Sequence, residues 1–258
     1  IAKKEAWSRR EFARKETIAH SEKLLLELHG KTHDLLSALL PTHVVLLLER
    51  QQRHHERQAI AEYYSDVSII FTDMKGFTRF SSTVTPSELV VFLNDMYKRF
   101  DNISEEYNIF KVEIIGDAYF GVSGAPNPCE DHADKIARAA LAFIDSVEQM
   151  KLDTPALKKA DVNVRIGCHS GAVVAGVVGV KDPRYHLFGK NVSEAERMES
   201  SGVPGRIQCS DAFAKEVKDL PVKQYTLVAR ERVEGARDQT WFIERNAGYV
   251  AERKEGRE

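Results

Sequence analysis

The spacing of hydrophobic residues divides the chain into two regions of different character. Residues 1–58 are rich in charged side chains, and their apolar residues tend to return at seven-residue intervals. The apolar members of this repeat are Ile18, Leu25, Leu28, Leu35 and Leu39. Such a repeat predicts a long helix that pairs with a second helix as a coiled coil. Ser21 and Thr32 also fall on the seam and weaken it, so a lone amphipathic helix is the alternative.

Pro41 should stop or kink this helix, because its ring removes a hydrogen-bond donor and clashes with the preceding turn. Residues 43–58 then predict a second, shorter helix that leads into the rest of the chain. From Asp66 onward the pattern changes to strands that alternate with helices. The second region therefore predicts a mixed fold and not a continuation of the helical one.

The predicted elements after Asp66 have a characteristic order. A strand at 67–71 is followed by a helix at 86–107, a hairpin over 109–124 that turns at 115–117, and a helix at 129–150. Next come a strand and a Gly-rich hairpin over 160–179, a helix at 191–200, a strand at 206–209, a helix from 210, and strands at 224–229 and 239–243. This order predicts an α+β fold with a ferredoxin-like (βαββαβ) core and extra strands and helices. The fold alone does not indicate an activity.

The composition excludes several classes of protein. Because 37 basic residues balance 39 acidic ones, the charge gives no reason to expect binding to nucleic acid or to an anionic membrane. No apolar run approaches the roughly 18 to 20 residues of a membrane-spanning helix. The chain opens on Ile1 without a signal peptide, so we expect a piece of a longer protein with an upstream sensor or membrane domain. Three widely spaced cysteines without a CxxC motif predict reduced thiols in the cytoplasm: Cys129, Cys168 and Cys209.

Two carboxylates stand where predicted strands end. Asp73 follows strand 67–71, and Asp117 lies in the turn of hairpin 109–124. These strands are neighbours in a ferredoxin-like sheet, so both side chains can reach the same end of it. Mg²⁺ commonly takes one or two carboxylates while substrate phosphates complete its shell, and two ions can clamp the attacking and leaving oxygens of a phosphoryl transfer. The alternative is that each Asp caps a turn.

The backbone on either side of Asp73 offers a place for phosphates. The carbonyls before it belong to Phe71 and Thr72. The amides after it belong to Met74, Lys75, Gly76 and Phe77. Amides at the start of a helix bind phosphate well, because their N–H groups have no partner within the helix.

Four segments resemble, in order and spacing, the signature blocks of the class III nucleotidyl cyclase catalytic domain. They read FTDMKGFT, FKVEIIGDAYFGVSG, VRIGCHSGAVVAGVVG and PRYHLFGKNVSEAERMES. The resemblance covers about residues 62–244 and extends to receptor-type and soluble guanylate cyclases, in which a dimerising linker precedes this domain. It implies a helical coiled-coil linker at 1–58, a cyclase catalytic domain at 59–245 and a polar tail at 246–258.

The resemblance implies an enzyme that converts a nucleoside triphosphate to a 3′,5′-cyclic monophosphate and pyrophosphate with two Mg²⁺ or Mn²⁺ ions. In this family two catalytic domains pair head to tail, and the active sites lie in the interface between them. One chain supplies two metal-binding aspartates, here Asp73 and Asp117. The partner supplies the residues that read the base and stabilise the transition state.

The position that reads the base in this family, four residues before the second metal aspartate, holds Glu113. Guanylate cyclases have Glu there and adenylate cyclases have Lys, so Glu113 favours GTP over ATP. The alternative is a strand glutamate that faces solvent. The second base position holds His186 where guanylate cyclases usually have Cys. Because an imidazole can donate or accept a hydrogen bond, His186 does not distinguish the two purines.

The transition-state residues match the family only in part. Ser193 stands where the family has Asn, and its shorter side chain offers only a hydroxyl. Arg197, one helical turn later, matches the family's arginine and faces the same way as Ser193. The alternative for Arg197 is a surface ion pair with Glu194 or Glu196.

The loop that carries the family's phosphate-binding lysine is also altered. Glu234 and Ala236 occupy the lysine positions, which leaves Arg237 as a displaced cation. The aspartates are intact while the other half of the site is changed, so we expect either the metal-donating subunit of a heterodimer or a weakly active homodimer. The alternatives are a non-catalytic partner that regulates another cyclase, and an adenylate cyclase that uses ATP. In each case the segment is expected to be cytoplasmic, either in a soluble protein or as the intracellular domain of a membrane-anchored receptor.

Overall fold

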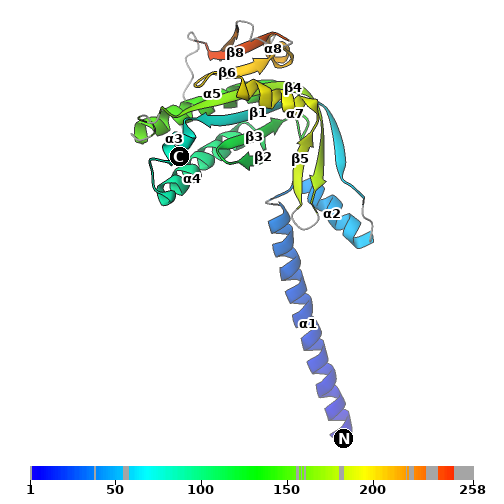
Figure 1. The fold of residues 1–258 in the computed structure, drawn as a ribbon. Coiled ribbons are helices and arrows are strands. Elements are labelled where there is room, and N and C mark those ends of the chain that lie inside the picture. The colour runs from blue at the N-terminus through cyan, green and yellow to red at the C-terminus, as the bar shows by residue number, and fades with distance from the viewer. Residues whose placement is uncertain are drawn as a thin grey trace. The chain divides into compact units, whose positions relative to one another are not determined.

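The computed structural model describes residues 2–37, 39–54, 58–154, 157, 159, 161–179, 183–218, 220, 224–230 and 238–246. The chain divides into two compact units, whose elements are labelled in Figure 1. The first comprises Ile1–Ile60 and Val177–Tyr185, and the second comprises Ala61–Gly176 and His186–Glu258. The second unit holds most of the residues singled out above.

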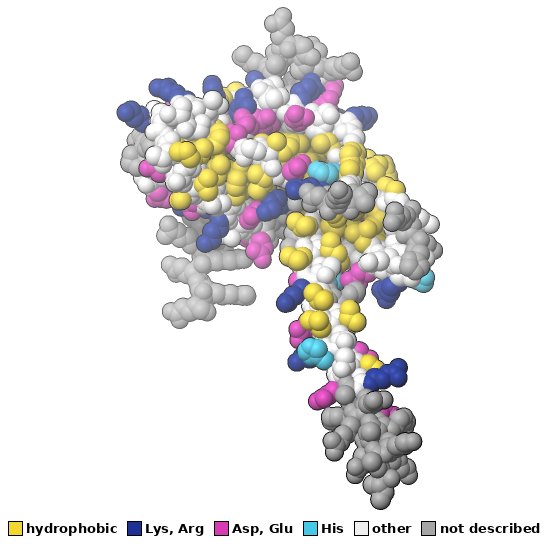
Figure 2. Space-filling model, turned by 60° about the horizontal axis from the view of Figure 1, so that its bottom comes forward, with side chains coloured by type: hydrophobic (Ala, Val, Ile, Leu, Met, Phe, Trp, Pro, Cys, Tyr) yellow, Lys and Arg dark blue, Asp and Glu magenta, His cyan; other side chains and the backbone are white. Residues whose placement is uncertain are grey.

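The first unit contains the helices α1 (Ala2–Ser37) and α2 (Thr42–His54). The predicted break at Pro41 is confirmed, because α1 ends four residues before it and α2 begins directly after it. His33 of α1 lies 2.9 Å from Glu49 of α2, measured from Nδ1 to Oε1. Along α1, hydrophobic side chains are visible at the surface in Figure 2. Pairing of this helix with a second copy stays a prediction.

The described strands form one mixed sheet in the order β2-β3-β1-β4-β6-β8-β7, with β5 paired to β4. The strands are β1 (Ala61–Lys75), β2 (Phe110–Ile115), β3 (Ala118–Ser123), β4 (Asn163–Val178), β5 (Arg184–Phe188), β6 (Ile207–Ser210), β7 (Tyr225–Ala229) and β8 (Thr240–Arg245). The helices that follow β1 are α3 (Phe77–Ser81), α4 (Pro86–Glu106), α5 (His132–Asp153), α7 (Lys190–Ser200) and α8 (Asp211–Lys218). No helix in the described part of the chain is long and apolar enough to cross a membrane.

Local sequence explains where α4 begins and which face it buries. Thr85 and Glu88 form a reciprocal capping box, and the helix starts at Pro86, whose missing N–H costs nothing there. One face of α4 then carries apolar side chains at helical spacing, and these are buried: Phe92, Met96 and Phe100. Together with α5 this helix covers one face of the sheet, and both helices contribute to the main hydrophobic core.

Strand β1 shows how the two faces of the sheet differ. Ile70, Thr72 and Met74 are buried, whereas Phe71 and Asp73 are only half-buried, as strand alternation requires. Ile70 and Met74 belong to the core beneath α4 and α5, so Asp73 faces the opposite side. On that side α7 packs closely on β4, because a Cβ at Gly167 would lie 2.0 Å from the backbone nitrogen of Glu199. Burial of the strand therefore fixes the backbone that carries Asp73.

The predicted α+β order is confirmed, with three corrections. Asp73 lies within β1 and not after it, because pairing with β4 continues to Lys75. Residues 160–179 contain no hairpin; β4 runs unbroken to Val178, and its hairpin partner is β5. The short helix α3 was not predicted. The predicted tail at 246–258 lies outside the described residues apart from Asn246.

Candidate active site

Strand pairing brings Asp73 and Asp117 to the same place. The turn between β2 and β3 consists of Gly116 and Asp117, and β3 is the hydrogen-bonded neighbour of β1. The backbone N–H of Met74 donates to Asp117 Oδ2 at 3.3 Å, which ties the turn to the residue after Asp73. Gly116 has a φ of 65°, a conformation that favours glycine, and its carbonyl accepts a hydrogen bond from the Tyr97 hydroxyl. The two aspartates are thus held on a rigid frame.

An arginine not expected from the sequence lies among these carboxylates. Arg165 is the cross-strand neighbour of Asp73 on β4, and its Nη2 donates to Asp73 Oδ2 at 2.5 Å. Its Nε lies 2.9 Å from Glu199 Oε1 on α7. Arg165 Nε and Glu199 Oε1 are both buried, and neither has a well-aligned hydrogen bond among the described residues. Their contact is therefore an ion pair of poor alignment. Arg165 therefore bridges two carboxylates from different elements.

The cluster carries more negative charge than Arg165 can balance. Burial raises the pKa of Asp117, and the nearby charge of Asp73 raises it further. Burial likewise raises the pKa of Glu199 to about 7, despite the attraction of Arg165. Burial and the charge of Asp117 raise the pKa of Tyr97 to about 12, so its hydroxyl stays protonated and can donate. A divalent cation would relieve the repulsion between Asp73 and Asp117, and carboxylate oxygens are the ligands Mg²⁺ and Mn²⁺ prefer. The residues present therefore fit a metal site.

The backbone around Asp73 is less available for phosphate than its sequence indicates. The Thr72 side chain is fully buried and accepts a hydrogen bond from the Tyr119 backbone N–H at 3.3 Å. The Phe71 ring stacks on Phe120, with centroids 4.2 Å apart. The Met74 amide is already bound to Asp117, and Lys75 pairs with Asn163 across the sheet. The amides of Gly76 and Phe77, where α3 begins, lie beyond the pairing of β1 with β4, and phosphate binding by this segment stays a prediction.

The two residues predicted to read the base lie together. His186 Nδ1 on β5 is 3.7 Å from Glu113 Oε2 on β2, and both side chains are about 70% buried, with 28% and 29% of their surface exposed. The register between β2 and β3 shifts between Lys111 and Glu113, which is the irregularity of a β-bulge. The carboxylate is therefore not fully solvated, and an imidazole is its neighbour.

Ser193 and Arg197 lie on α7, on the less buried part of the helix. Ser193 is exposed. Arg197 donates to the carboxylate of Glu194 through Nε at 3.0 Å and through Nη2. The ion pair given above as the alternative for Arg197 is thus present. A hollow of about 660 Å³ is lined by Glu194 and Arg197, and also by Asp238 and Gln239 from the segment before β8.

Asn191 is not free to replace the asparagine missing at position 193. Its Nδ2 donates to the carbonyl of Ala172 at 2.6 Å, and its Oδ1 lies 3.1 Å from His169 Nε2. A Cβ at Gly171 would lie 2.6 Å from the Asn191 side chain, so the glycine leaves room for this contact. Asn191 therefore anchors α7 to β4.

The remaining predicted residues lie outside the described part of the chain: Glu234, Ala236 and Arg237. Arg165 and Glu199 were missed, although both lie within the segments that carried the resemblance. The sequence signal for Arg165 is its position next to Ile166 in an apolar strand. Because successive side chains of a strand point to opposite faces, Arg165 lies on the face opposite to Ile166, which is the face that carries Asp73.

Comparison with known proteins identifies the family. The family model described as "Adenylate and Guanylate cyclase catalytic domain" matches residues 59–245, which is most of the chain. This chain belongs to that family. Among similar proteins of this cyclase family, the receptor-type guanylate cyclase gcy-28 of Caenorhabditis elegans is 43% identical over 180 residues, 70% of this chain. The soluble guanylate cyclase subunit alpha-1 of Rattus norvegicus is 38% identical over 220 residues, 85% of this chain. The chain spans only 14% and 30% of the lengths of these two relatives.

Solved structures of cyclase domains share the fold. The guanylate cyclase domain of RhGC from Catenaria anguillulae, in complex with GTP, is 32% identical with a TM-score of 0.62 and covers 72% of this chain and 100% of its own. A non-canonical dimeric guanylyl cyclase domain of the RhoGC fusion protein from Blastocladiella emersonii is 31% identical with a TM-score of 0.64, and covers 72% of this chain and 99% of its own. The class III cyclase fold is therefore confirmed.

Proposed function

We propose that this chain is the catalytic domain of a guanylate cyclase, which converts GTP to 3′,5′-cyclic GMP and pyrophosphate at a dimer interface. The proposed boundaries are 1–58 for the helical linker, 59–245 for the catalytic domain and 246–258 for the tail. The observation that carries the proposal is the convergence of Asp73 on β1 and Asp117 in the β2–β3 turn, where burial and then the charge of Asp73 raise the pKa of Asp117.

In the proposed reaction the ribose 3′-hydroxyl gives its proton to solvent, and its oxygen attacks the α-phosphorus. The bond from that phosphorus to the bridging oxygen breaks, and pyrophosphate leaves. Two Mg²⁺ or Mn²⁺ ions held by Asp73 and Asp117 would supply charge stabilisation for the attacking and leaving oxygens. The amides of Gly76 and Phe77 stand beside that pair and would orient the phosphates. Arg197 would place its positive charge against the phosphate once it leaves Glu194.

Preference for GTP rests on Glu113. The Watson–Crick edge of guanine presents N–H donors, which a carboxylate accepts and adenine cannot match in the same arrangement. His186, 3.7 Å from Glu113, would help orient the carboxylate or contact the base itself. The similar proteins named guanylate cyclases, and the similar domain in complex with GTP, support the same preference.

The proposal includes a second chain, because in this family each active site is built from residues of two chains. Exposed apolar side chains on the second unit support association, and hydrophobic side chains gather on the face seen in Figure 2. The exposed apolar side chains of the second unit include Val90, Val91, Ile115 and Phe188. The similar domain from Blastocladiella emersonii is described as dimeric.

Two forms of the dimer remain, and the altered residues favour a heterodimer. Ser193 is a short replacement for asparagine, Arg197 is bound by Glu194, and the lysine positions of the loop hold Glu234 and Ala236. In a heterodimer this chain would donate the metals and its partner the transition-state residues. A weakly active homodimer is the other form. The exposed leucines of α1, at positions 25, 28 and 35, support a paired linker that carries a signal from an upstream domain in the cytoplasm.

The test is a cyclase assay of the purified chain with GTP and with ATP in Mn²⁺, alone and mixed with a cyclase domain that carries the asparagine, arginine and lysine. We expect weak cyclic GMP formation by the chain alone, a higher rate in the mixture, and little cyclic AMP. Full activity of the chain alone would contradict the heterodimer, and preference for ATP would contradict the role of Glu113. No product in any combination would favour a non-catalytic partner.

A further inference from the structure

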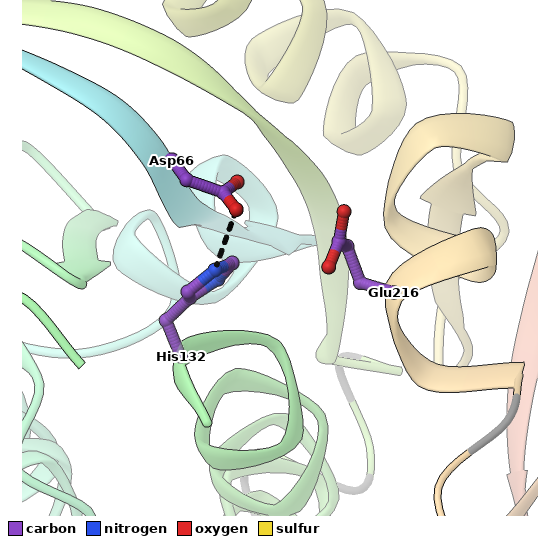
Figure 3. Close-up of side chains that lie close together, drawn as sticks. All are labelled: Asp66, His132 and Glu216. Atoms are coloured by element: carbon purple, nitrogen blue, oxygen red, sulfur yellow. Dashed lines mark ion pairs between the residues drawn. The ribbon is translucent and has the colours of Figure 1, made fainter. Parts of the chain in front are cut away.

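A cluster outside the candidate active site combines one histidine with two carboxylates. His132 begins α5, Asp66 lies on β1 and Glu216 lies on α8. Each offers one ligand atom, and the three atoms lie within 4.8 Å of one another. Figure 3 shows the three side chains pointing toward a common centre from three different elements. None of the three residues has a role in the proposed cyclase reaction.

His132 is buried and its orientation is fixed. The residue is only 3% exposed, and its Nδ1 lies 2.8 Å from the hydroxyl of Ser68, which lies 2.6 Å from the hydroxyl of Ser170. When Nδ1–H donates to Ser68 and Ser68 donates to Ser170, Nε2 carries the lone pair that a metal ion requires. A hydrogen-bonded partner on the far nitrogen is a regular feature of histidines that bind metals.

The other nitrogen of His132 is aimed into the cluster without a hydrogen bond. Its Nε2 lies 3.6 Å from Asp66 Oδ2, which is too far for one, and it has no other partner among the residues that the structure describes. Nε2 therefore contacts Asp66 at ion-pair distance only, and a cation held between the two side chains would bind both of them. The direction of Nε2 is set by the contact of Nδ1 with Ser68, which does not involve either carboxylate.

The backbone also favours this arrangement. The pairing of β1 with β4 shifts register between Tyr64 and Val67, so Asp66 lies in a β-bulge, a feature that redirects side chains. Gly124 has a φ of 91°, and a Cβ there would lie 3.0 Å from the Asp66 carbonyl oxygen and 3.4 Å from His132 Cβ. The segment that leads from β3 to α5 therefore lies tightly against both residues.

We propose that Asp66, His132 and Glu216 form a binding site for a divalent transition-metal ion of the Zn²⁺ class. Imidazole suits Zn²⁺, whereas Mg²⁺ and Ca²⁺ prefer sites made of oxygen alone. Bond lengths of about 2.0–2.2 Å place tetrahedral ligands about 3.4 Å apart, close to the 3.6 Å already present between His132 and Asp66. Glu216 is exposed on α8 and can approach by a change of rotamer, and a water molecule can take the fourth position.

Such an ion would join three elements that are far apart in the sequence. The carboxylate of Asp66 is 58% exposed, which gives a metal ion a path from solvent. An ion that binds only the folded chain stabilises it by mass action. The same strand β1 carries Asp73, so occupancy would also stiffen the frame of the candidate active site.

The experiment uses the full chain, free of any affinity tag, with the substitutions Asp73→Asn and Asp117→Asn to remove the other carboxylate pair. We expect this parent to bind Co²⁺ with visible absorption bands of a nitrogen- and oxygen-ligated ion, and to bind Zn²⁺ in competition with Co²⁺ but not with Mg²⁺. Zn²⁺ should also raise its melting temperature. Adding Glu216→Gln should weaken Zn²⁺ binding at least about tenfold and remove the thermal shift.

Glu216→Gln is the decisive variant, because the side chain is exposed and its loss should not disturb folding. Glu130→Gln is the matched control, since Glu130 is an exposed carboxylate two residues from His132 that is not part of the cluster. Ser68→Ala should weaken Zn²⁺ binding about tenfold by releasing the imidazole. Equal Zn²⁺ affinity in the parent and Glu216→Gln, or no saturable Zn²⁺ binding by the parent, overturns the proposal.

Discussion

Asp73 lies on β1 and Asp117 in the turn that joins β2 to β3, whereas Ser193 and Arg197 lie on the less buried side of one short helix. The first pair is fixed by cross-strand hydrogen bonds and by the contact from the Met74 amide to Asp117. The second pair has no comparable support, and Arg197 is neutralised by Glu194 within its own helix. The two halves of the candidate site therefore differ in how far they are organised before substrate arrives.

The contrast also applies to charge. The half that contains Asp73 and Asp117, the proposed metal-binding half, has an excess of carboxylates whose repulsion is only partly offset by Arg165, which favours binding of cations. The other half holds its cation in an exposed ion pair, which is worth little and is easily exchanged for a phosphate. The carboxylates of the first half are already arranged for metal ions. In the second half Arg197 must leave Glu194 before it can bind phosphate, or a partner chain must supply the arginine. Altering each half separately should therefore have different consequences for stability and activity.

The largest effect is expected in the metal-binding half. Asp117→Asn should lower cyclase activity of whichever dimer is active by at least about 1000-fold, because several kcal/mol of charge stabilisation depend on the ions. The same change should raise the melting temperature of the metal-free protein at neutral pH. The raised pKa of Asp117 means that its ionised form costs stability above that pKa, and asparagine removes this cost while keeping an acceptor for the Met74 amide.

Activity would be followed by cyclic GMP formation in Mn²⁺, and stability by thermal unfolding in a chelator. Asp95→Asn, at an exposed carboxylate paired with Arg99 on α4, serves as the control and should change neither quantity appreciably. A variant of Asp117 that is inactive and also less stable would indicate lost folding and not lost metal binding.

A smaller effect is expected from α7. If this chain supplies its own transition-state arginine, Arg197→Ala should lower activity about 100-fold. Glu194→Gln should then raise activity about twofold, since it releases an ion pair worth a few tenths of a kcal/mol. Both rates would be measured on the chain alone at saturating GTP, with Glu196→Gln as the neighbouring control on the same helix. Unchanged activity in Arg197→Ala would mean that the partner's arginine is the one used.

The convergence of Asp73 and Asp117 could be predicted from the sequence because its signals are local. Apolar alternation identified the strands, and a glycine beside Asp117 identified the turn that brings the carboxylate to Asp73. How far β1 pairs with β4 could not be predicted from the local sequence. Only the register of β1 with β4 places Asp73 inside the strand and opposite Arg165, and only that register shows that the Met74 amide is already occupied.

The other half was harder to predict because its contacts join distant segments. That Asn191 is bound to β4 depends on Gly171 leaving room for it, twenty residues earlier in the chain. The pairing of Glu113 with His186 follows from the sheet and was expected only through the family resemblance. The cluster of Asp66, His132 and Glu216 gave no signal in the sequence, since a bulge, a helix start and a surface helix bring it together.

The smallest effect concerns Glu199, which joins the two halves by reaching from α7 to Arg165 on β4. Its pKa is raised by burial to about 7, from an ordinary value of 4.5. Between these two pH values the folded state binds a proton that the unfolded state has released, so this group's contribution to stability is present below pH 4.5 and is lost as the pH rises to about 7. Glu199→Gln removes that dependence.

We therefore expect the melting temperature of Glu199→Gln, relative to the unsubstituted protein, to increase between pH 5 and pH 8, by an amount equivalent to about 1–2 kcal/mol after allowance for screening. Glu196→Gln, an exposed neighbour on the same helix, should show no such trend. A difference that stays constant with pH would mean that Arg165 keeps Glu199 ionised throughout. In that case the ion pair would join α7 to the metal-binding strands as a permanent link, and the two halves would be more rigidly coupled than the raised pKa of Glu199 implies.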